Sequence, residues 1–143
     1  MAGLIPQRIN SSDIRDFTWL ADYTGMEEAQ PVTLHYASLN ADGNHKLENW
    51  VKSGTPLGEI TAAGATQGQF GLYDPAATDG RENHVGFLKA EVQLQDPVTN
   101  TSNAPITGAA LRFGQIIVPR LPVAFDTTPA TGTVSSHFIY RTN

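Results

Sequence analysis

The fold class is decided by the central stretch of the chain, residues 50–88, which reads WVKSGTPLGEITAAGATQGQFGLYDPAATDGRENHVGFL. Short apolar segments lie at residues 57–61, 70–73 and 84–88. Glycines and prolines separate these segments, and the pair Asp79 and Gly80 is a strong turn signal because both residue types tolerate the backbone angles of tight turns. Apolar segments of this length between such turns predict β-strands.

The sequence on both sides continues the same pattern. Residues 30–37 alternate, with Val32, Leu34 and Tyr36 on one side, which predicts a half-buried strand. Further strands are expected at residues 46–51, 84–94, 106–118 and 134–140. We expect the strand at residues 84–94 to be the longest. Short strands that recur about every ten residues predict an all-β domain, a small barrel or sandwich.

The first thirty residues differ from the rest of the chain. We expect them to form an N-terminal arm, residues 1–30, ahead of a β-rich domain, residues 31–143. Ser11–Asp13 contains residue types that cap helices, and Ile14 and Phe17 would then share one helix face. An extended arm that becomes ordered only on binding fits the same residues. The sequence leaves these two alternatives open.

Composition excludes several classes of function. The 143 residues include no cysteine, which excludes disulfides, thiolate nucleophiles and cysteine-based zinc sites. The net charge is −5, so the chain gains nothing from releasing counterions on a phosphate backbone, and we expect no nucleic-acid partner. No apolar run approaches the ~18 residues of a membrane-spanning helix, and we expect no membrane partner. The amino-terminal residues lack a secretory signal pattern, which predicts synthesis in the cytoplasm.

Two groups of residues have the composition of a ligand site. Asn40, Asp42, Asn44 and Glu48 resemble the beginning of a calcium-binding loop. The twelfth position of such a loop requires a carboxylate and here is Val51, so a hairpin turn is the better interpretation. Asp74, Asp79, Glu82 and His84 are the second group, with oxygen and imidazole groups close together in sequence. Aspartate before glycine usually bonds to the backbone, which favours a structural turn there as well.

The remaining nucleophile and phosphate motifs are incomplete. Gly64, Gly68 and Gly71 are not followed by the lysine and helix that a phosphate-binding loop needs. Ser135 and Ser136 precede a histidine but lack the Gly-x-Ser-x-Gly turn of serine hydrolases. We therefore expect no catalytic residue, no metal site, no cofactor and no enzymatic activity.

The central stretch also carries three motifs. They are Ser-Gly-Thr-x-Leu-Gly at residues 53–58, Tyr-Asp-x-x-x-x-Asp-Gly at residues 73–80, and Val-Gly-Phe-Leu at residues 85–88. In this order and at these separations they resemble the signature of the bacteriophage head decoration protein family, the lambda D-like capsid cement proteins. The resemblance covers about the middle third of the chain. The signature residues are Ser53, Gly54, Thr55, Leu57, Gly58, Tyr73, Asp74, Asp79, Gly80, Val85 and Gly86.

This resemblance implies a β-rich, tulip-like subunit that forms a homotrimer. Such a trimer would bind the major capsid protein on the outer surface of the expanded head, at threefold and quasi-threefold positions, and would stabilise the shell against the pressure of the packaged genome. The protein would then be part of the virion. Large apolar residues of the arm are the expected capsid contacts, namely Ile5, Ile9, Phe17, Trp19 and Tyr23. The segment after Leu121 departs from the shortest family members.

Two other functions fit parts of the sequence. A carbohydrate-binding β-sandwich of a phage tail or baseplate would stack sugars on Trp19, Trp50, Tyr36 or Tyr73. A trimeric β-barrel nucleotide hydrolase would have to hold Mg²⁺ with the residues from Asp74 to His84.

Overall fold

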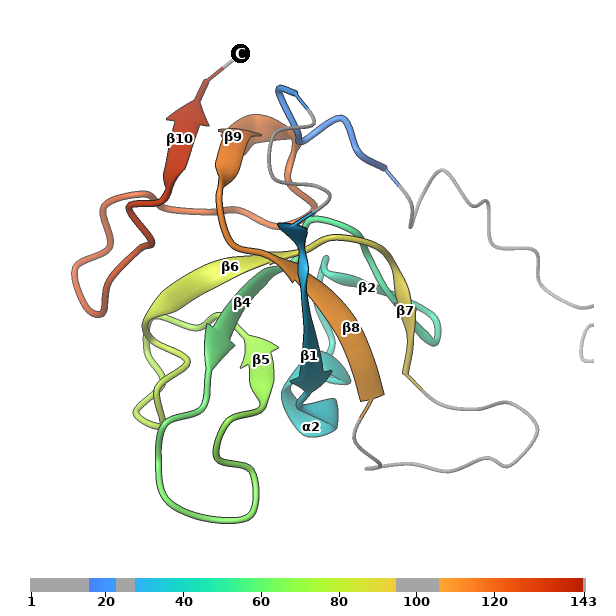
Figure 1. The fold of residues 1–143 in the computed structure, drawn as a ribbon, viewed down its shortest axis with the longest axis vertical. Helices are drawn as coiled ribbons and strands as arrows, with labels where there is room; N and C mark the ends of the chain where they lie inside the picture. The colour runs from blue at the N-terminus through green and yellow to red at the C-terminus, as the bar shows by residue number, and fades with distance from the viewer. Residues whose placement is uncertain (1–15, 23–27, 95–105, 143) are drawn as a thin grey trace, which may run out of the picture.

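The computed structural model describes residues 16–22, 28–94 and 106–142 of the chain. At its centre five short strands form a closed barrel in the order β1-β5-β4-β6-β8 (Figure 1). The barrel strands are β1 (Gln30–Leu34), β4 (Pro56–Glu59), β5 (Phe70–Leu72), β6 (His84–Leu88) and β8 (Ile106–Leu111). The predicted all-β fold class is confirmed.

Two smaller sheets and two helical turns complete the described part of the chain. The first sheet contains β2 (Lys46–Leu47), β3 (Trp50–Val51) and β7 (Val92–Gln93). The second contains β9 (Gly114–Ile117) and β10 (Phe138–Arg141), which run parallel. The helical turns are α2 (Tyr36–Leu39) and the 3₁₀ turn η3 (Val118–Arg120). Figure 1 shows β9 and β10 together at one end of the barrel.

Close backbone approach shapes the barrel wall. β1 pairs antiparallel with β8 along its full length, whereas β4 shifts its register on β6 between Leu57 and Gly58. A Cβ atom at Gly58 would lie 2.6 Å from the carbonyl oxygen of Arg81, and one at Gly86 would lie 2.5 Å from that of Leu111. Such contacts are too short for any side chain, so glycine is required where these strands and the adjoining turn meet.

The buried apolar residues form two clusters. The first lies within the barrel and against α2, β3 and the end of β7. Its fully buried members are Leu34, Leu39, Val51, Leu57, Leu88 and Ala110. The second lies between the barrel and the β9–β10 sheet and is rich in aromatic residues. Its buried members are Trp19, Leu20, Tyr73, Phe87, Leu111, Ile116, Leu121, Phe125 and Phe138.

Several predicted strands are divided or shortened. The segment 84–94, expected as one strand, forms β6 and β7, because the chain leaves the barrel after Leu88 and β7 pairs with β3 instead. The segment 106–118 is divided into β8 and β9 before Gly114, whose φ of 148° is a conformation that favours glycine. β1 ends at Leu34, since the side chain of His35 caps α2 by accepting a hydrogen bond from the amide of Ser38.

The predicted boundary between an arm and a domain at residue 30 does not follow the structure. Gln30 is the first residue of β1, and residues 19–21 pair with β9. The amide of Ile117 donates to the carbonyl of Trp19 over 2.7 Å, and the amide of Ala21 donates to the carbonyl of Gln115 over 3.0 Å. Residues 16–22 are not helical and belong to the β domain, while residues 1–15 lie outside the described residues.

The expectation that Trp19 is an exposed capsid contact is wrong for the same reason. Its side chain is fully buried, its ring packs 5.8 Å from that of Phe87, and its indole N–H donates to the hydroxyl of Ser53. A large apolar ring gains more from burial in its own subunit than from exposure to water. Among the other expected contacts Phe17 is half-buried, and Ile5, Ile9 and Tyr23 lie outside the described residues.

Replacing Trp19 tests this placement. We expect Trp19→Ala to lower the free energy of unfolding by about 3 to 5 kcal/mol, because it removes a fully buried ring and leaves a cavity. Phe17→Ala is the matched control and is expected to cost less than half as much, since Phe17 is only half-buried. Urea unfolding followed by circular dichroism measures both values. A Trp19→Ala variant as stable as the parent chain would contradict the described packing.

Candidate functional site

The first signature motif joins the amino-terminal segment to the barrel. The hydroxyl of Ser53 accepts from the indole of Trp19 over 3.1 Å and donates to the carbonyl of Lys89 over 2.8 Å. At Gly54 the φ angle is 89°, and a Cβ atom there would lie 2.8 Å from the indole nitrogen. The hydroxyl of Thr55 donates to the carbonyl of Lys52 over 2.8 Å. All three residues are buried, and the contacts of Ser53 and Gly54 join segments that are distant in the chain.

The first and third motifs lie side by side in the barrel wall. Leu57 of β4 pairs with Gly86 of β6, and Gly58 pairs with His84. Leu57 is fully buried in the first core cluster, and Val85 is partly buried against the same cluster. The two motifs are therefore neighbours in space although almost thirty residues separate them in the chain.

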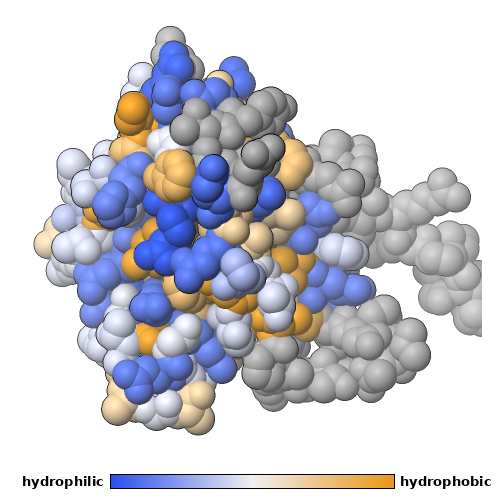
Figure 2. Space-filling view, viewed as in Figure 1, coloured by the Kyte–Doolittle hydropathy of each residue, from blue (hydrophilic) through white to orange (hydrophobic). Residues whose placement is uncertain are grey.

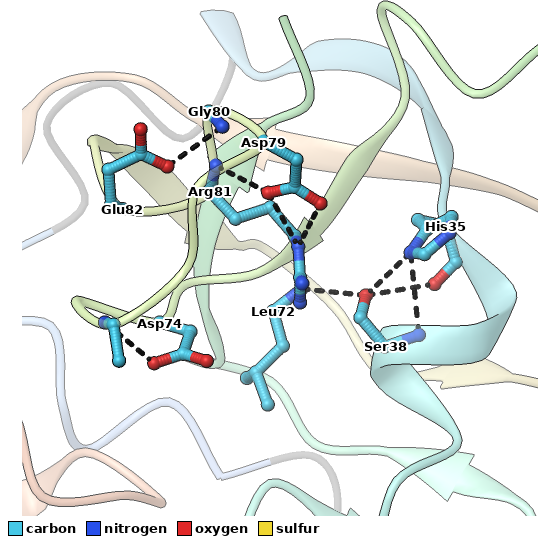
Figure 3. A network of polar contacts seen from close by, with 9 residues as sticks. His35, Ser38, Leu72, Asp74, Asp79, Gly80, Arg81 and Glu82 are labelled. Atoms are coloured by element: carbon cyan, nitrogen blue, oxygen red, sulfur yellow. Dashed lines mark hydrogen bonds and ion pairs between the residues drawn. The ribbon is translucent and has the colours of Figure 1, made fainter. Parts of the chain in front are cut away.

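The second motif is a turn whose carboxylates bond within the turn (Figure 3). Asp79 forms an ion pair with the guanidinium of Arg81 at 3.0 Å and also accepts from the amide of Arg81. Asp74 accepts from the amide of Ala76 over 3.0 Å, and Glu82 accepts from the amide of Gly80 over 2.8 Å. The structural turn that the sequence favours here is confirmed.

The electrostatics of this turn stabilise the carboxylate of Asp79. Burial alone would favour its neutral form, but hydrogen bonds and the positive charge of Arg81 outweigh this and lower the pKa of Asp79. A carboxylate that is ionised and bonded to its own turn fits a structural role better than that of a general acid. No group of three or more histidine or acidic side chains placed to hold a metal ion occurs among the residues described.

A polar contact that the sequence did not predict joins α2 to Leu72, the last residue of β5. The hydroxyl of Ser38 accepts from the amide of Leu72 over 3.1 Å and lies 3.0 Å from the Nδ1 atom of His35 (Figure 3). Burial, assisted by the nearby charge of Arg81, lowers the pKa of His35. The only local signal for this contact is the pair His35 and Ser38 at cap spacing, which gives no indication that β5 is the partner.

His84 does not join the carboxylates with which the sequence grouped it. Its ring is buried among aromatic rings, with centroid distances of 4.6 Å to Phe87, 4.8 Å to Phe125 and 5.5 Å to Tyr73. Its Nδ1 atom accepts from the amide of Ser135 over 3.2 Å, which requires a neutral ring. Desolvation lowers the pKa of His84 to about 3, against a weaker opposing effect of the Gly86 carbonyl.

The buried His84 makes stability depend on pH. The unfolded chain binds a proton at this residue near pH 6.5 and the folded chain only near pH 3, so the unfolded state holds more protons between these values. We expect the contribution of neutral His84 to the free energy of unfolding to be complete above pH 6.5. Between pH 6.5 and pH 3 it should decrease by about 1.4 kcal/mol for each unit by which the pH falls.

Urea unfolding between pH 7 and pH 4 measures this effect. His84→Phe, which retains the ring and removes the titrating group, should reduce the dependence of stability on pH by about one proton. His137→Gln replaces an exposed histidine and should keep the parent dependence. Equal dependence in the parent and in His84→Phe would contradict a neutral, buried His84.

The loop that resembles a calcium site follows α2 and is not the hairpin turn that the sequence predicts there, because β1 pairs with β5 and β8 and not with β2. The hairpin lies instead within residues 46–51, which were expected to form one strand. β2 and β3 pair antiparallel, and Glu48 in the turn has a φ angle of 54°. The ammonium group of Lys46 donates to the backbone and side-chain oxygens of Asn40 over 2.8 and 3.0 Å. Val51, at the position where a calcium loop would need a carboxylate, is fully buried in the first core cluster.

The described surface combines polar and apolar side chains (Figure 2). Phe113 and Ile139 are its large exposed hydrophobic residues, with exposed fractions of 39% and 61%. Phe113 borders an open hollow of about 410 Å³ together with Gln30, Arg112 and His137. The guanidinium of Arg112 donates to the side-chain carbonyl of Gln30 over 3.0 Å and lies 5.7 Å from the centroid of the Phe70 ring. These contacts to Gln30 and to the buried ring of Phe70 hold the charge of Arg112 at the border of the hollow that Phe113 also lines.

The aromatic residues considered for sugar stacking are mostly in the interior. Trp19, Tyr36 and Tyr73 are buried, with exposed fractions of 9% or less, and Trp50 is half-buried. A ring must expose one face to stack on a sugar. Of these four residues, only Trp50 is exposed enough to do so. Among the described residues no helix is long and apolar enough to cross a membrane.

Comparison of the chain with protein-family models, with curated proteins and with solved structures gave no match. The interpretation of the surface therefore depends on the geometry described above and on the motifs of the central stretch.

Proposed function

We propose that this chain is a non-enzymatic virion component, a capsid decoration protein that binds the outer surface of the expanded phage head as a homotrimer. One observation carries the proposal: the three signature motifs, separate in sequence, form one continuous part of the barrel and its adjoining turn. Leu57 pairs with Gly86, and a Cβ atom at Gly58 would touch the backbone of Arg81 beside the second motif. The motifs thus act as a single structural unit.

The use of the polar signature residues supports a structural role. Ser53 and Thr55 donate to backbone carbonyls, and Asp74 and Asp79 accept from backbone amides of their own turn. Side chains that satisfy the backbone of a tight turn stabilise the fold. The ordered scaffold they build is suited to presenting a fixed surface to another protein.

The proposed mechanism of stabilisation is thermodynamic linkage. A protein that binds the assembled, expanded shell better than its separate subunits shifts the equilibrium toward the assembled shell. A trimer placed where three capsomers meet contacts all of them, so modest contacts for each subunit combine into high avidity. The shell is then held together at the junctions where internal pressure would separate the capsomers.

Binding to shells tests the proposal directly. Purified protein is mixed with expanded heads and with unexpanded precursor heads of the phage that encodes the chain, and the heads are sedimented. We expect saturable binding to expanded heads alone, together with a higher temperature for the opening of the decorated shell.

A protein that stays in the supernatant with both kinds of head would overturn the proposal. Glycan binding that is lost in Trp50→Ala would instead support the carbohydrate-binding module. The precursor heads serve as the control for nonspecific adhesion, since they contain the same capsid protein in a different arrangement.

A further inference from the structure

The sheet formed by β9 and β10 has one face toward the core and one face toward the outside. The strands run parallel in register, with Phe138 opposite Gly114 and Ile139 opposite Gln115. Successive side chains of a strand point to opposite faces, and Phe138 belongs to the buried aromatic cluster. The opposite face carries Gln115, Ile139 and Arg141, with Phe113 and His137 directly before the two strands, and we call these five residues the outer β9–β10 face. Ile117, which follows the same alternation opposite Arg141, is buried.

The outer β9–β10 face has the composition of a protein contact. Phe113 and Ile139, the large exposed hydrophobic residues of the described chain, both belong to it. Its charged residue is Arg141, and Arg112 borders it at the hollow beside Phe113. None of the five residues of the face is acidic, although the chain as a whole has a net charge of −5. Exposed apolar side chains grouped with charges of one sign favour a partner of the opposite sign.

An acidic patch lies beside the same aromatic cluster. Inward from the outer β9–β10 face, the ring of Tyr140 lies 5.7 Å from that of Phe125, and Phe125 lies 5.7 Å from Tyr73. Asp74 and Asp126 lie near Tyr73, where their negative charges add to burial in raising the pKa of its hydroxyl. Asp126 is exposed, and Asp74 is partly exposed. The aromatic cluster is thus bordered both by a basic, apolar face and by an acidic patch.

We infer that the outer β9–β10 face of one subunit binds the patch of Asp74 and Asp126 on a second copy of this chain. The two surfaces are different parts of the subunit, so the contact is heterologous. A heterologous contact that repeats through a rotation of 120° closes a ring of three subunits. That the ring contains three subunits rests on the proposed function, whereas the choice of the two surfaces rests on their opposite charge. Ile139 and Phe113 would become buried in the contact, and Arg141 would approach the carboxylates.

Charge reversal with rescue tests the inference. The mass of the protein is measured by light scattering after size-exclusion chromatography over a dilution series. We expect Arg141→Glu and Asp126→Arg each to raise the concentration at which the assembly dissociates by about tenfold or more, because like charges then face each other. The double variant restores opposite charges and should return close to the parent value. Arg120→Glu, an exposed arginine outside the face, is the matched control and should behave as the parent.

Disulfide trapping gives a second measurement that does not depend on weakening the assembly. The chain has no cysteine, so the double variant Ile139→Cys with Asp126→Cys reports on these two positions alone. Oxidation should give covalently linked dimers and trimers, whereas Arg120→Cys with Asp126→Cys should remain single.

The outcomes separate this inference from the proposed function. If the unmodified protein is a trimer, all charge variants have the same mass and the cysteine variant does not cross-link, the choice of surfaces is wrong. The proposed role in capsid decoration is unaffected by that result. If the unmodified protein remains monomeric at every concentration, both this inference and the homotrimer of the proposed function are overturned. Binding to expanded heads would then decide the capsid role independently.

Discussion

The contact of the Trp19 indole with the Ser53 hydroxyl and with Gly54 is the constraint on which the position of the β9–β10 sheet depends. The indole can lie there because Gly54 has no side chain, and the hydroxyl of Ser53 satisfies the buried indole N–H. From this point the amino-terminal segment pairs with β9, and β9 pairs with β10. The aromatic cluster beneath that sheet joins it to the barrel. A glycine in the first motif therefore determines where a sheet sixty residues later is held.

The same constraint links the fold to the proposed function. Trp19, His84 and the carboxylate of Asp79 are occupied by contacts within the subunit. The large apolar side chains that remain exposed in the described part of the chain, Phe113 and Ile139, lie at the β9–β10 sheet, which the cluster fixes against the barrel. A rigid surface that carries exposed apolar groups favours protein association. Under the proposed function, this rigidity allows a small subunit to resist forces that act on a much larger shell.

Local sequence patterns predicted the elements of the barrel better than their arrangement. The turn at Asp79 and Gly80 was predictable because its geometry depends on the two residues themselves. The division of residues 84–94 was not, since the exchange of partners after Leu88 depends on β3, which is distant in the chain. Trp19 was misinterpreted because an isolated apolar segment gives no sign of its partner. His84 was grouped with carboxylates by proximity in sequence, whereas burial among aromatic rings determines its chemistry.

The central claim is that this β subunit acts by covering junctions in a viral shell. Cryo-electron microscopy of intact heads tests it most directly, because the barrel and its β9–β10 sheet have a shape that can be recognised in the density. The account predicts three copies of the barrel at each threefold and quasi-threefold position on the outside of expanded heads. Heads that contain the protein elsewhere, or that lack it at these positions after incubation with an excess, would contradict it.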